Sequence, residues 1–535
     1  MARRAGDAAA QGFLIAADLV ALTALLLSAC AGLPPRPEVP ASHALTEVAG
    51  TRLARTLDEA TPPAKRGLSG FRLLPEGEFA FNARIALAHR AERSIDAQYY
   101  LIQNDDIGQQ FLRELRDAAA RGVRVRLLVD DLYAAGEDEL FAGLAAYPNV
   151  ELRVFNPPPV RGGGFTTRLM LSLGEFGRIN HRTHNKLFIA DNTFVVSGGR
   201  NIANEYFMRS EEANFIDVDV LSSGPVVHEL SGVFDSYWNS DRVYPIAALV
   251  SAATAARSPD AARARFDELV HDAAPKVAER ERDVLGSTPV SQQLDSGTLD
   301  QTYAGARVFA DTPDKVAGVS AEAAEKTVTG QTLALFAASR DSVSIVSPYF
   351  IPGARGLAMM QRAHEAGGKV TLVTNSIGAT DEPLVHDRYA RYRLGMLKAG
   401  VHIYEVSPPV SGRSEHLGRF GRSSARLHAK TAVTDKRLLF IGSMNLDARS
   451  ARANTEVGLV IDSPELIDRA SGALFHTLTA SGSYELRLAP DGEHIQWLEH
   501  GADNATVVHD TEPESAWLLR LKLWLLAPFV GDELL

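Results

Sequence analysis

Two stretches of the sequence carry the same polar residues at the same spacing. They read HNKLFIADNTFVVSGGRN and HAKTAVTDKRLLFIGSMN. In each, a histidine is followed two positions later by a lysine and then by an aspartate, and a turn further on opens with glycine and ends with asparagine. The shared positions are His184, Lys186, Asp191, Gly198 and Asn201 in the first stretch, and His428, Lys430, Asp435, Gly442 and Asn445 in the second.

These residue types favour chemistry at a phosphodiester. Side chains two positions apart on a strand share a face, so each histidine and its lysine should point at one ligand. Two ammonium groups flanked by the amides of Asn201 and Asn445 form a cradle for the charge of a phosphodiester and of its crowded transition state. Neither the aspartates nor the histidine spacing suggests a metal site, so we predict no metal and no cofactor.

A pair of histidines can divide the work of group transfer. A neutral imidazole attacks phosphorus to give a phosphohistidine, and a protonated one donates a proton to the leaving alcohol. The second histidine then acts as base for the incoming nucleophile. The residues alone leave open which of His184 and His428 takes which part.

The turns around the histidines should be shaped by small residues and by the two aspartates. Glycine lets backbone approach closely, and helices that follow the turns could add N-terminal amides to the site. The aspartates fall where a strand ends, which favours a structural part in fixing the loop over a catalytic one. The residues expected to shape the turns are Gly198, Gly199, Gly442, Ser443, Asp191 and Asp435.

The two stretches belong to a longer internal repeat. Tyr99 and Tyr349 are 250 residues apart and each ends a predicted strand, a Pro-Pro-Val segment recurs at the same offset, and the two histidines are 244 apart. A fixed order of markers at nearly one offset indicates a duplicated domain with a shorter loop in the second copy. Helix and strand alternate in both copies, which predicts an α/β fold with helices covering a largely parallel sheet.

Length and composition set the domain plan. A chain of 535 residues is too long for one ordinary core, and its net charge of -11 argues against a general nucleic-acid binder. We place the first domain at 70–248, Ala-rich linker helices at 249–300, the second domain at 301–500 and a C-terminal tail at 501–535.

The N-terminus predicts a secreted, lipid-anchored protein. A basic start and an apolar run precede LSAC, which resembles the bacterial lipoprotein box, so residues 1–29 are predicted as a signal peptide and Cys30 as the lipidated residue. Ala31 after the cysteine favours the outer membrane, and Pro-rich residues 30–69 should hold the body off the bilayer, facing the periplasm of the cell envelope. The alternatives are an uncleaved membrane anchor or a buried free cysteine.

The C-terminal tail contains an amphipathic helix. Trp517, Leu518, Leu521, Trp524 and Leu525 share one face. The helix either docks this face on the core or lies in a bilayer surface, since it is too short to span one.

With these observations the chain is identified as resembling the phospholipase D superfamily, whose duplicated His-Lys-Asp motifs it carries over about residues 70–500. The resemblance implies two similar α-β-α sandwich halves related by a pseudo-twofold axis, with the active site at their interface. It implies His184 as nucleophile and His428 as acid and base, although the roles could be swapped. It also implies an orienting carboxylate for each histidine. Asp217 and Glu456 are the candidates, with Asp219 and Glu212 as competitors in the first copy.

The finer resemblance is to the bacterial cardiolipin synthase C group, on INHRTHNKLFIADNTFVVSGGRNIANEYF and RLKLWLLAPFVGDELL, with Arg200 where many relatives have serine. It implies transfer of a phosphatidyl group onto phosphatidylglycerol, giving cardiolipin and a small alcohol, with phosphatidylethanolamine as a possible second lipid. Cardiolipin synthesis would be expected at the inner membrane, in tension with Ala31. A hydrolytic phospholipase D and a non-catalytic lipid-binding lipoprotein are the alternatives, and the oligomeric state stays open.

Arginines before each motif could select the lipid. The segments 161–182 and 413–426 each carry a net charge of +3 in an acidic chain. If they converge over the site, they form a collar for anionic headgroups; the alternative is a set of scattered, solvated arginines. The predicted headgroup ligands are Arg178, Arg182, Arg422 and Arg426.

Overall fold

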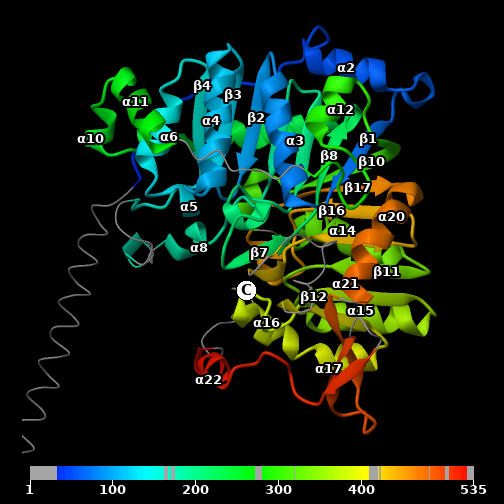
Figure 1. The fold of residues 1–535 in the computed structure, drawn as a ribbon. Helices are drawn as coiled ribbons and strands as arrows, with labels where there is room; N and C mark the ends of the chain where they lie inside the picture. Colours follow the sequence, from blue (N-terminus) through cyan, green and yellow to red (C-terminus); the bar gives the residue numbers. More distant parts are fainter. Residues whose placement is uncertain are drawn as a thin grey trace, which may run out of the picture.

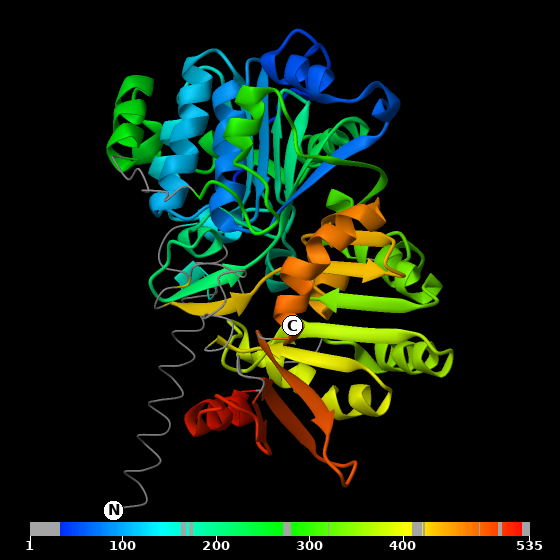
Figure 2. The ribbon, with the colours of Figure 1, turned by 45° about the vertical axis from the view of Figure 1, so that its right-hand side comes forward.

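The computed structural model describes residues 33–161, 167–168, 170, 175–270, 280–318, 320–408, 420, 423–480, 482–500 and 505–526. The predicted signal peptide and Cys30 lie outside these residues. Eighteen of the described strands form a continuous sheet that runs through two halves of the molecule (Figures 1 and 2), and two more form a separate pair. No described helix is long and apolar enough to cross a membrane.

The first half is built on eight strands with helices on both faces. From one edge to the other the strands pair in the order β9 (Val243–Pro245), β4 (Val150–Phe155), β3 (Arg124–Asp130), β2 (Ser94–Tyr99), β5 (Leu187–Ala190), β6 (Phe194–Gly198), β8 (Asp219–Ser223) and β1 (Ser69–Leu74). Figure 1 shows α3 (Gly77–Arg90), α4 (Asp106–Ala120) and α6 (Asp138–Ala145) in front of this sheet. Helix α9 (Pro225–Trp238) packs its apolar side against the other face, within a second core cluster.

The second half repeats this order. Its strands pair as β10 (Thr302–Ala310), β17 (Val457–Asp462), β16 (Leu438–Gly442), β15 (Thr431–Thr434), β11 (Ser342–Val346), β12 (Lys369–Asn375), β13 (His402–Val406) and β18 (Ser483–Leu488). The hairpin of β19 (Ile495–His500) and β20 (Thr506–His509) extends the edge at β18. The helices of this half are α14 (Val328–Ala338), α15 (Gly353–Glu365), α16 (Pro383–Ala390), α17 (Arg393–Lys398), α20 (Pro464–Ala470) and α21 (His476–Ala480).

The halves meet at β1 and β10, which pair antiparallel and join the two sheets. One core cluster crosses this junction, since it contains Leu230 and Phe234 of α9 together with Leu439 and Leu459 of the second half. The pairing orders on the two sides of β1 and β10 are equivalent, which gives the predicted pair of α-β-α halves related by a pseudo-twofold axis. The expected fold class is therefore confirmed.

The sheet is mostly antiparallel, so the prediction of a largely parallel sheet was wrong. Among the named strands, parallel pairing is confined to β2, β3 and β4, to β11, β12 and β13, and to the separate pair β7 (Ala213–Ile216) and β14 (Ser424–Leu427). The other pairs of named strands are antiparallel, and two of them, β5–β6 and β15–β16, have three-residue connections, which can join only antiparallel neighbours.

The exact register of the repeat also differs from the expected one. Ile95 lies opposite Ala190 in the first half, and Val343 lies opposite Thr434 in the second. Ala190 and Thr434 directly precede the two motif aspartates, so equivalent residues in these first strands are 248 apart. Tyr99 therefore corresponds to Ser347 rather than to Tyr349.

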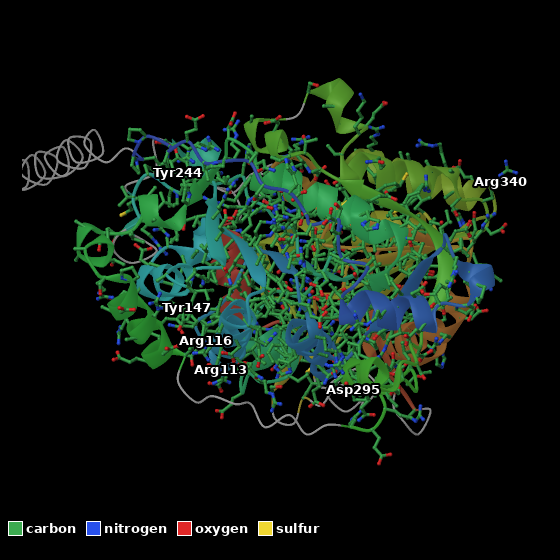
Figure 3. The ribbon with its side chains drawn as sticks, turned by 90° about the horizontal axis from the view of Figure 1, so that it is seen from above. Arg113, Arg116, Tyr147, Tyr244, Asp295 and Arg340 are labelled. Carbon is green, nitrogen blue, oxygen red and sulfur yellow. The ribbon has the colours of Figure 1, made fainter. Side chains whose placement is uncertain are left out.

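The segment between the halves lies on the first half instead of bridging open space. Its helices are α10 (Ala252–Ala255), α11 (Pro259–Leu269) and α12 (Val290–Ser296). Arg116 and Tyr147, labelled in Figure 3, both hold Asp267 of α11, and Ser291 of α12 accepts a hydrogen bond from Asn82 of α3 at 3.0 Å.

The predicted Pro-rich spacer is also docked on the body from residue 33 onward. Arg36 Nε donates to the Val243 carbonyl at 2.9 Å, Trp238 Nε1 donates to Ser42 Oγ at 2.8 Å, and the amide of Ala44 donates to Asp235. The segment leads into α2 (Arg52–Ala60). The segment thus satisfies polar groups of the first half, and its part in holding the body off a bilayer stays a prediction.

Candidate active site

Each His-x-Lys pair lies directly before a strand rather than on it. His184 and Lys186 precede β5, and His428 and Lys430 precede β15. Strand alternation therefore does not set their directions. Instead each lysine Nζ donates to the carbonyl oxygen of its own histidine, at 2.8 Å in the first half and 2.6 Å in the second. This bond folds the lysine back toward the imidazole.

The two histidines are held by backbone of the opposite half. The His184 amide donates to the Thr455 carbonyl at 2.8 Å, and the His428 amide donates to the Ile216 carbonyl at 2.8 Å. The accepting residues directly precede the two predicted orienting carboxylates. The parallel pairing of β7 with β14 is part of the same connection, because β7 ends at Ile216.

Each predicted carboxylate contacts the histidine of the other half. His184 Nδ1 lies 3.0 Å from Glu456 Oε2, and His428 Nδ1 lies 2.7 Å from Asp217 Oδ2. All four side chains are buried, with His184 at 7% and His428 at 5% exposure. Engagement of Nδ1 leaves Nε2 of each ring available for chemistry. The competitor Asp219 instead accepts a hydrogen bond from Arg84 at 2.9 Å.

The motif turns differ between the halves at two positions, and the difference at the first of them has a steric cause. Ser443 Oγ donates to Glu456, whereas Gly199 stands at the equivalent position. A Cβ atom on Gly199 would lie 2.4 Å from Asp217 Oδ1. Glycine is required there because the aspartate occupies the space. Gly198 and Gly442 lie as close to the neighbouring strands, where a Cβ atom would meet Asp219 and the Val457 carbonyl.

Arg200 replaces the serine of many relatives and is fully buried. Its guanidinium donates to the carbonyls of Leu74 and Pro75 at 2.9 and 2.6 Å, and to that of Asp217. It therefore fixes the backbone around Asp217 and does not face a ligand.

Each motif aspartate binds backbone amides at the start of a neighbouring strand, β2 in the first half and β11 in the second. Asp191 has a φ of 49° and accepts hydrogen bonds from the amides of Glu92, Arg93 and Ser94, the last two at 2.7 and 3.0 Å. Asp435 accepts the equivalent bonds from Arg340, Asp341 and Ser342. Both hold the turn against a neighbouring strand. Among the described residues, neither aspartate forms a hydrogen bond with a histidine.

Burial makes the histidines weak bases. It lowers the pKa of His184 to about 4, helped by the charge of Lys186 and opposed by Glu456. It likewise lowers the pKa of His428 to about 4, helped by Lys430. Both imidazoles are therefore neutral at neutral pH in the ligand-free site.

The lysines are affected in the same direction. Burial lowers the pKa of Lys186 to about 7 and that of Lys430 to about 8, against the attraction of nearby carboxylates. Burial acts to raise the pKa of Asp217, but His428 and the charge of Arg200 hold it down at about 2. A phosphodiester brought between the lysines would restore their full charge.

The predicted asparagines have unused polar atoms. Asn201 donates through Nδ2 to the Tyr206 hydroxyl at 2.9 Å. The Oδ1 atoms of Asn201 and Asn445 are buried and have no partner among the described residues. The expected helix N-termini contribute less than predicted. The helices after the turns are only η3 (Asn204–Phe207) and α19 (Ala448–Arg452), and carboxylates of Asp105 and Asp447 already bind their first amides.

Aromatic residues flank the histidines in both halves. The Tyr100 ring meets His184 edge-on at 5.1 Å between centroids, and Lys186 Nζ lies 5.5 Å from the centre of the same ring. Tyr206 meets His428 in the same way at 5.0 Å. Neither tyrosine was predicted as a site residue, because their positions relative to the motifs differ between the halves.

The arginine collar is only partly formed. Arg182 is 1% exposed and binds Asp130 at 3.2 Å and the carbonyls of Ile179 and Asn156, so its prediction as a headgroup ligand was wrong. Arg178 binds Glu175 and Asn156, both at 2.6 Å. Arg426, on β14, has no partner for Nε among the described residues. Arg422 lies outside them.

Carboxylates missed by the sequence analysis stand near the second histidine. The charge of Asp381 acts to raise the pKa of His428 and Lys430, and its Oδ2 accepts a hydrogen bond from the Tyr349 hydroxyl at 2.7 Å. Burial raises the pKa of the neighbouring Glu382 and brings that of Asp447 to about 6. The surroundings of the site are thus of mixed charge.

Within the part of the chain that the structure describes, no group of three histidine, cysteine or acidic side chains is placed to hold a metal ion. That the reaction needs no metal stays a prediction.

Known proteins resemble this chain in sequence and in fold. The family model described as cardiolipin synthase, PLD-like domain matches residues 85–238 and 332–476. Cardiolipin synthase C of Escherichia coli is 36% identical over 450 residues, covering 82% of this chain and 90% of that protein. A cardiolipin synthase of Geobacillus kaustophilus is 25% identical over 386 residues, covering 72% and 61%. The crystal structure of phosphatidylserine synthase from Haemophilus influenzae matches with a TM-score of 0.53 at 15% identity, over 90% of this chain and 99% of that one, which shows a shared fold.

Proposed function

The chain belongs to the cardiolipin synthase family of phospholipase D-like proteins, and from this membership we propose that it makes cardiolipin from phosphatidylglycerol and a second phospholipid through a phosphohistidine. The protein is a phospholipase D-type phosphatidyltransferase. The observation that supports the mechanism best is the pair of buried histidines, each with Nδ1 on a carboxylate and a lysine beside it.

In the first step His184 attacks the phosphorus of the donor lipid. Glu456 at Nδ1 fixes the tautomer that presents a lone pair at Nε2. A bond forms between Nε2 and phosphorus, and the bond from phosphorus to the headgroup oxygen breaks. His428 donates its proton to that oxygen, and a small alcohol leaves. The charge of the bound phosphodiester raises the pKa of His428 from its low ligand-free value.

In the second step a glycerol hydroxyl of phosphatidylglycerol attacks the phosphohistidine. His428, now neutral, takes the hydroxyl proton, and the bond from phosphorus to His184 breaks to release cardiolipin. Lys186 and Lys430 stabilise the charge on the nonbridging oxygens in both steps. The interchange of the two histidines would give the same products.

Phosphatidylethanolamine suits the donor position. Asp381 and Glu382, near Lys430 and His428, would attract an ammonium headgroup. Membrane attachment belongs to the proposal as well: the lipoprotein-type box ending in Cys30 supports a lipid anchor and a place in the bacterial cell envelope, facing the periplasm.

The test is to incubate purified protein with vesicles of phosphatidylglycerol, with and without phosphatidylethanolamine, and to resolve the lipid products. Cardiolipin is expected in both, with more when phosphatidylethanolamine is present. Phosphatidic acid as the sole product would instead identify a hydrolase. A phosphoenzyme trapped by acid quench should persist in His428→Ala and be lost in His184→Ala; the opposite pattern would reverse the roles.

A further inference from the structure

One described helix carries an exposed apolar face. Helix α22 (Trp517–Leu526) follows the β19–β20 hairpin and ends the described chain. Its residues Trp517, Leu518, Leu521, Trp524 and Leu525 are between 45% and 73% exposed. The other large apolar side chains that are exposed in the described chain lie singly or as a pair on other elements.

The exposed residues form a single stripe. At 100° per residue the five span an arc of about 120° around the helix. Arg520 borders the stripe on one side and Lys522 on the other, and both are exposed. The opposite side carries Leu519, which is half-buried, and Leu523, which is 9% exposed.

The chain before α22 is fastened to the second half. Glu512 binds His386 of α16 at 2.9 Å and Arg393 of α17 at 2.6 Å, and these contacts lower its pKa to about 2. Glu514 accepts hydrogen bonds from Ser376 and Tyr484, both at 3.1 Å. The helix therefore has a defined position on the second half, beside α16 (Figure 1).

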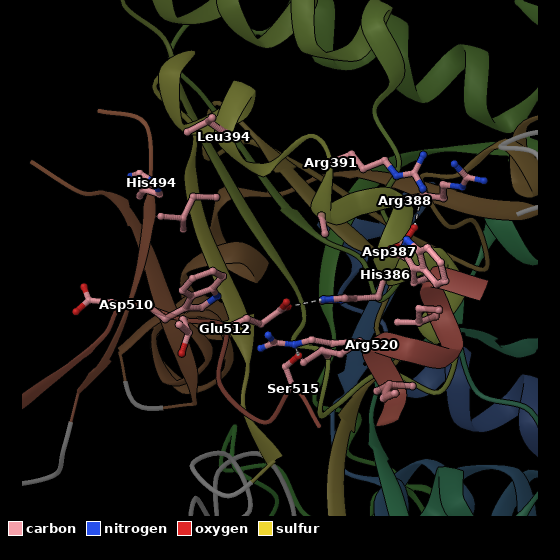
Figure 4. A pocket seen from close by; sticks show the side chains of 18 of the residues that line it. His386, Asp387, Arg388, Arg391, Leu394, His494, Asp510, Glu512, Ser515 and Arg520 are labelled. Atoms are coloured by element: carbon pink, nitrogen blue, oxygen red, sulfur yellow. Dashed lines mark hydrogen bonds and ion pairs between the residues drawn. The ribbon is translucent and has the colours of Figure 1, made fainter. Parts of the chain in front are cut away.

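The inner side of α22 does not complete a packed core. It borders a pocket of about 1190 Å³ whose other walls come from α16, α17 and the β19–β20 hairpin (Figure 4). Leu394 and Arg520 line this pocket, and neither motif histidine does. Trp524 and Leu525 also line the pocket, but they stay 73% and 53% exposed, so the apolar face of α22 is not docked on the core as the first alternative expected.

The position of α22 relates it to the active site. Helix α16, on which it packs, begins directly after Asp381 and Glu382. The charge of Asp381 acts on His428 and Lys430. One short helix thus separates the exposed apolar stripe from the carboxylates beside the reacting groups.

The stripe has the chemistry of a bilayer-surface helix. Ten residues span about 15 Å, half of the hydrocarbon thickness of a bilayer, so α22 can only lie along the surface. Tryptophan concentrates at the boundary between headgroups and acyl chains. The helix contains two cationic residues and no acidic one, which complements anionic lipid.

We propose that α22 lies in the headgroup layer of an anionic phospholipid bilayer, with its five exposed apolar side chains at the acyl boundary, and so holds the second half of the active site against the membrane. The binding of α22 to a bilayer does not depend on the proposed function. Its role does, because that role is to keep the site at the surface where a lipid substrate resides.

The test uses quenching of tryptophan emission by lipids brominated on the acyl chain. The chain has four tryptophans, of which Trp238 and Trp497 are buried at 0% and 7% exposure. Full-length protein is mixed with phosphatidylglycerol–phosphatidylcholine vesicles, brominated or not. Brominated lipid should quench the part of the fluorescence that Trp517 and Trp524 contribute. The variant carrying Trp517→Phe and Trp524→Phe should show no such quenching. Because bromine acts at short range, a lipid anchor elsewhere in the chain does not produce this signal.

The matched control is Val507→Ser with Val508→Ser, which removes an exposed apolar pair on β20 and should leave quenching unchanged. Leu521→Glu with Leu525→Glu should abolish it. Absence of quenching in the unmodified protein, or equal quenching after Leu521→Glu and Leu525→Glu, would overturn the inference. Cardiolipin is measured in the same samples, so quenching without product contradicts the proposed function alone, and product without quenching contradicts the helix alone.

Discussion

His184 Nδ1 lies 3.0 Å from Glu456 Oε2, although the two residues are 272 positions apart and belong to opposite halves of the duplication. The reciprocal contact of His428 with Asp217 is 2.7 Å long. Each half thus supplies a histidine that is oriented by the other half. The site is a property of the interface.

Removal of either orienting charge should slow the reaction without unfolding the chain. In Asp217→Asn and in Glu456→Gln the partner imidazole loses the carboxylate that fixes its tautomer, and kcat should fall by roughly 10²–10⁴-fold. The measurement is the rate of lipid product formation. Glu212→Gln alters a competitor that makes no hydrogen bond or ion pair with either histidine among the described residues, and its rate should stay at the parent value.

A kcat/KM profile should be bell-shaped, because it reports ionisations of the free enzyme. As pH falls through about 4, His184 gains a proton and loses its nucleophilic lone pair. As pH rises above about 4, His428 loses the proton that it donates to the leaving alcohol, and above about 7 to 8 Lys186 and then Lys430 also lose the protons that hold the phosphodiester. An alkaline limb that begins only near the ordinary lysine pKa of about 10 would contradict this assignment.

The two motif aspartates should differ in their effect on stability. Asp191→Ala leaves three amides without an acceptor beside a fully buried side chain, at about 1–3 kcal/mol for each buried donor. Asp435→Ala should cost less free energy of unfolding, because Asp435 is only half-buried, whereas Asp191 is fully buried, and water can replace its carboxylate. Urea unfolding of both variants gives the comparison, and equal losses would contradict it.

Acid should weaken the second of these turns at a defined pH. Hydrogen bonds from Ser339 and the backbone, working against burial, lower the pKa of Asp435 from its ordinary value of 3.8 to about 2. A lowered pKa contributes stability above the unfolded value, and that contribution is lost as pH falls through about 2. The difference in stability between Asp435→Asn and the parent should therefore shrink as pH falls from 4 toward 2.

Arginine substitutions should separate a structural residue from a headgroup ligand. Arg182→Gln breaks a buried pair with Asp130 and should lower the unfolding midpoint. Arg426→Gln should leave the midpoint unchanged but raise the KM for phosphatidylglycerol by roughly tenfold, the worth of one charge-assisted hydrogen bond. An unchanged KM in Arg426→Gln would remove the last described member of the collar.

The sequence was sufficient for the duplication and the carboxylate pair, because both are visible as repeated residue types at fixed spacing. It was insufficient to predict that each carboxylate orients the histidine of the other half. Spacing within one copy does not say that β7 pairs with β14, which is what brings Asp217 beside His428. The burial of the arginine side chains could not be predicted from the sequence either, since Arg182 and Arg426 have the same charge in similar loops but different surroundings.

The error about the sheet had a signal that could have been used. Only three residues separate β5 from β6, and apolar runs flank them on both sides. A connection this short requires an antiparallel pair. Alternation of helix and strand elsewhere in the chain outweighed this local feature. Contacts such as Tyr100 on His184 had no repeated pattern to reveal them.

The crossed partnership also governs when the molecule becomes active. A nascent chain that has emerged only as far as β9 holds His184 and Lys186 but has no Glu456, and its Asp217 has no imidazole to orient. A molecule that ends before β17 therefore lacks part of the set of reacting groups. Because of the duplication, both halves must fold and pair before the site is complete.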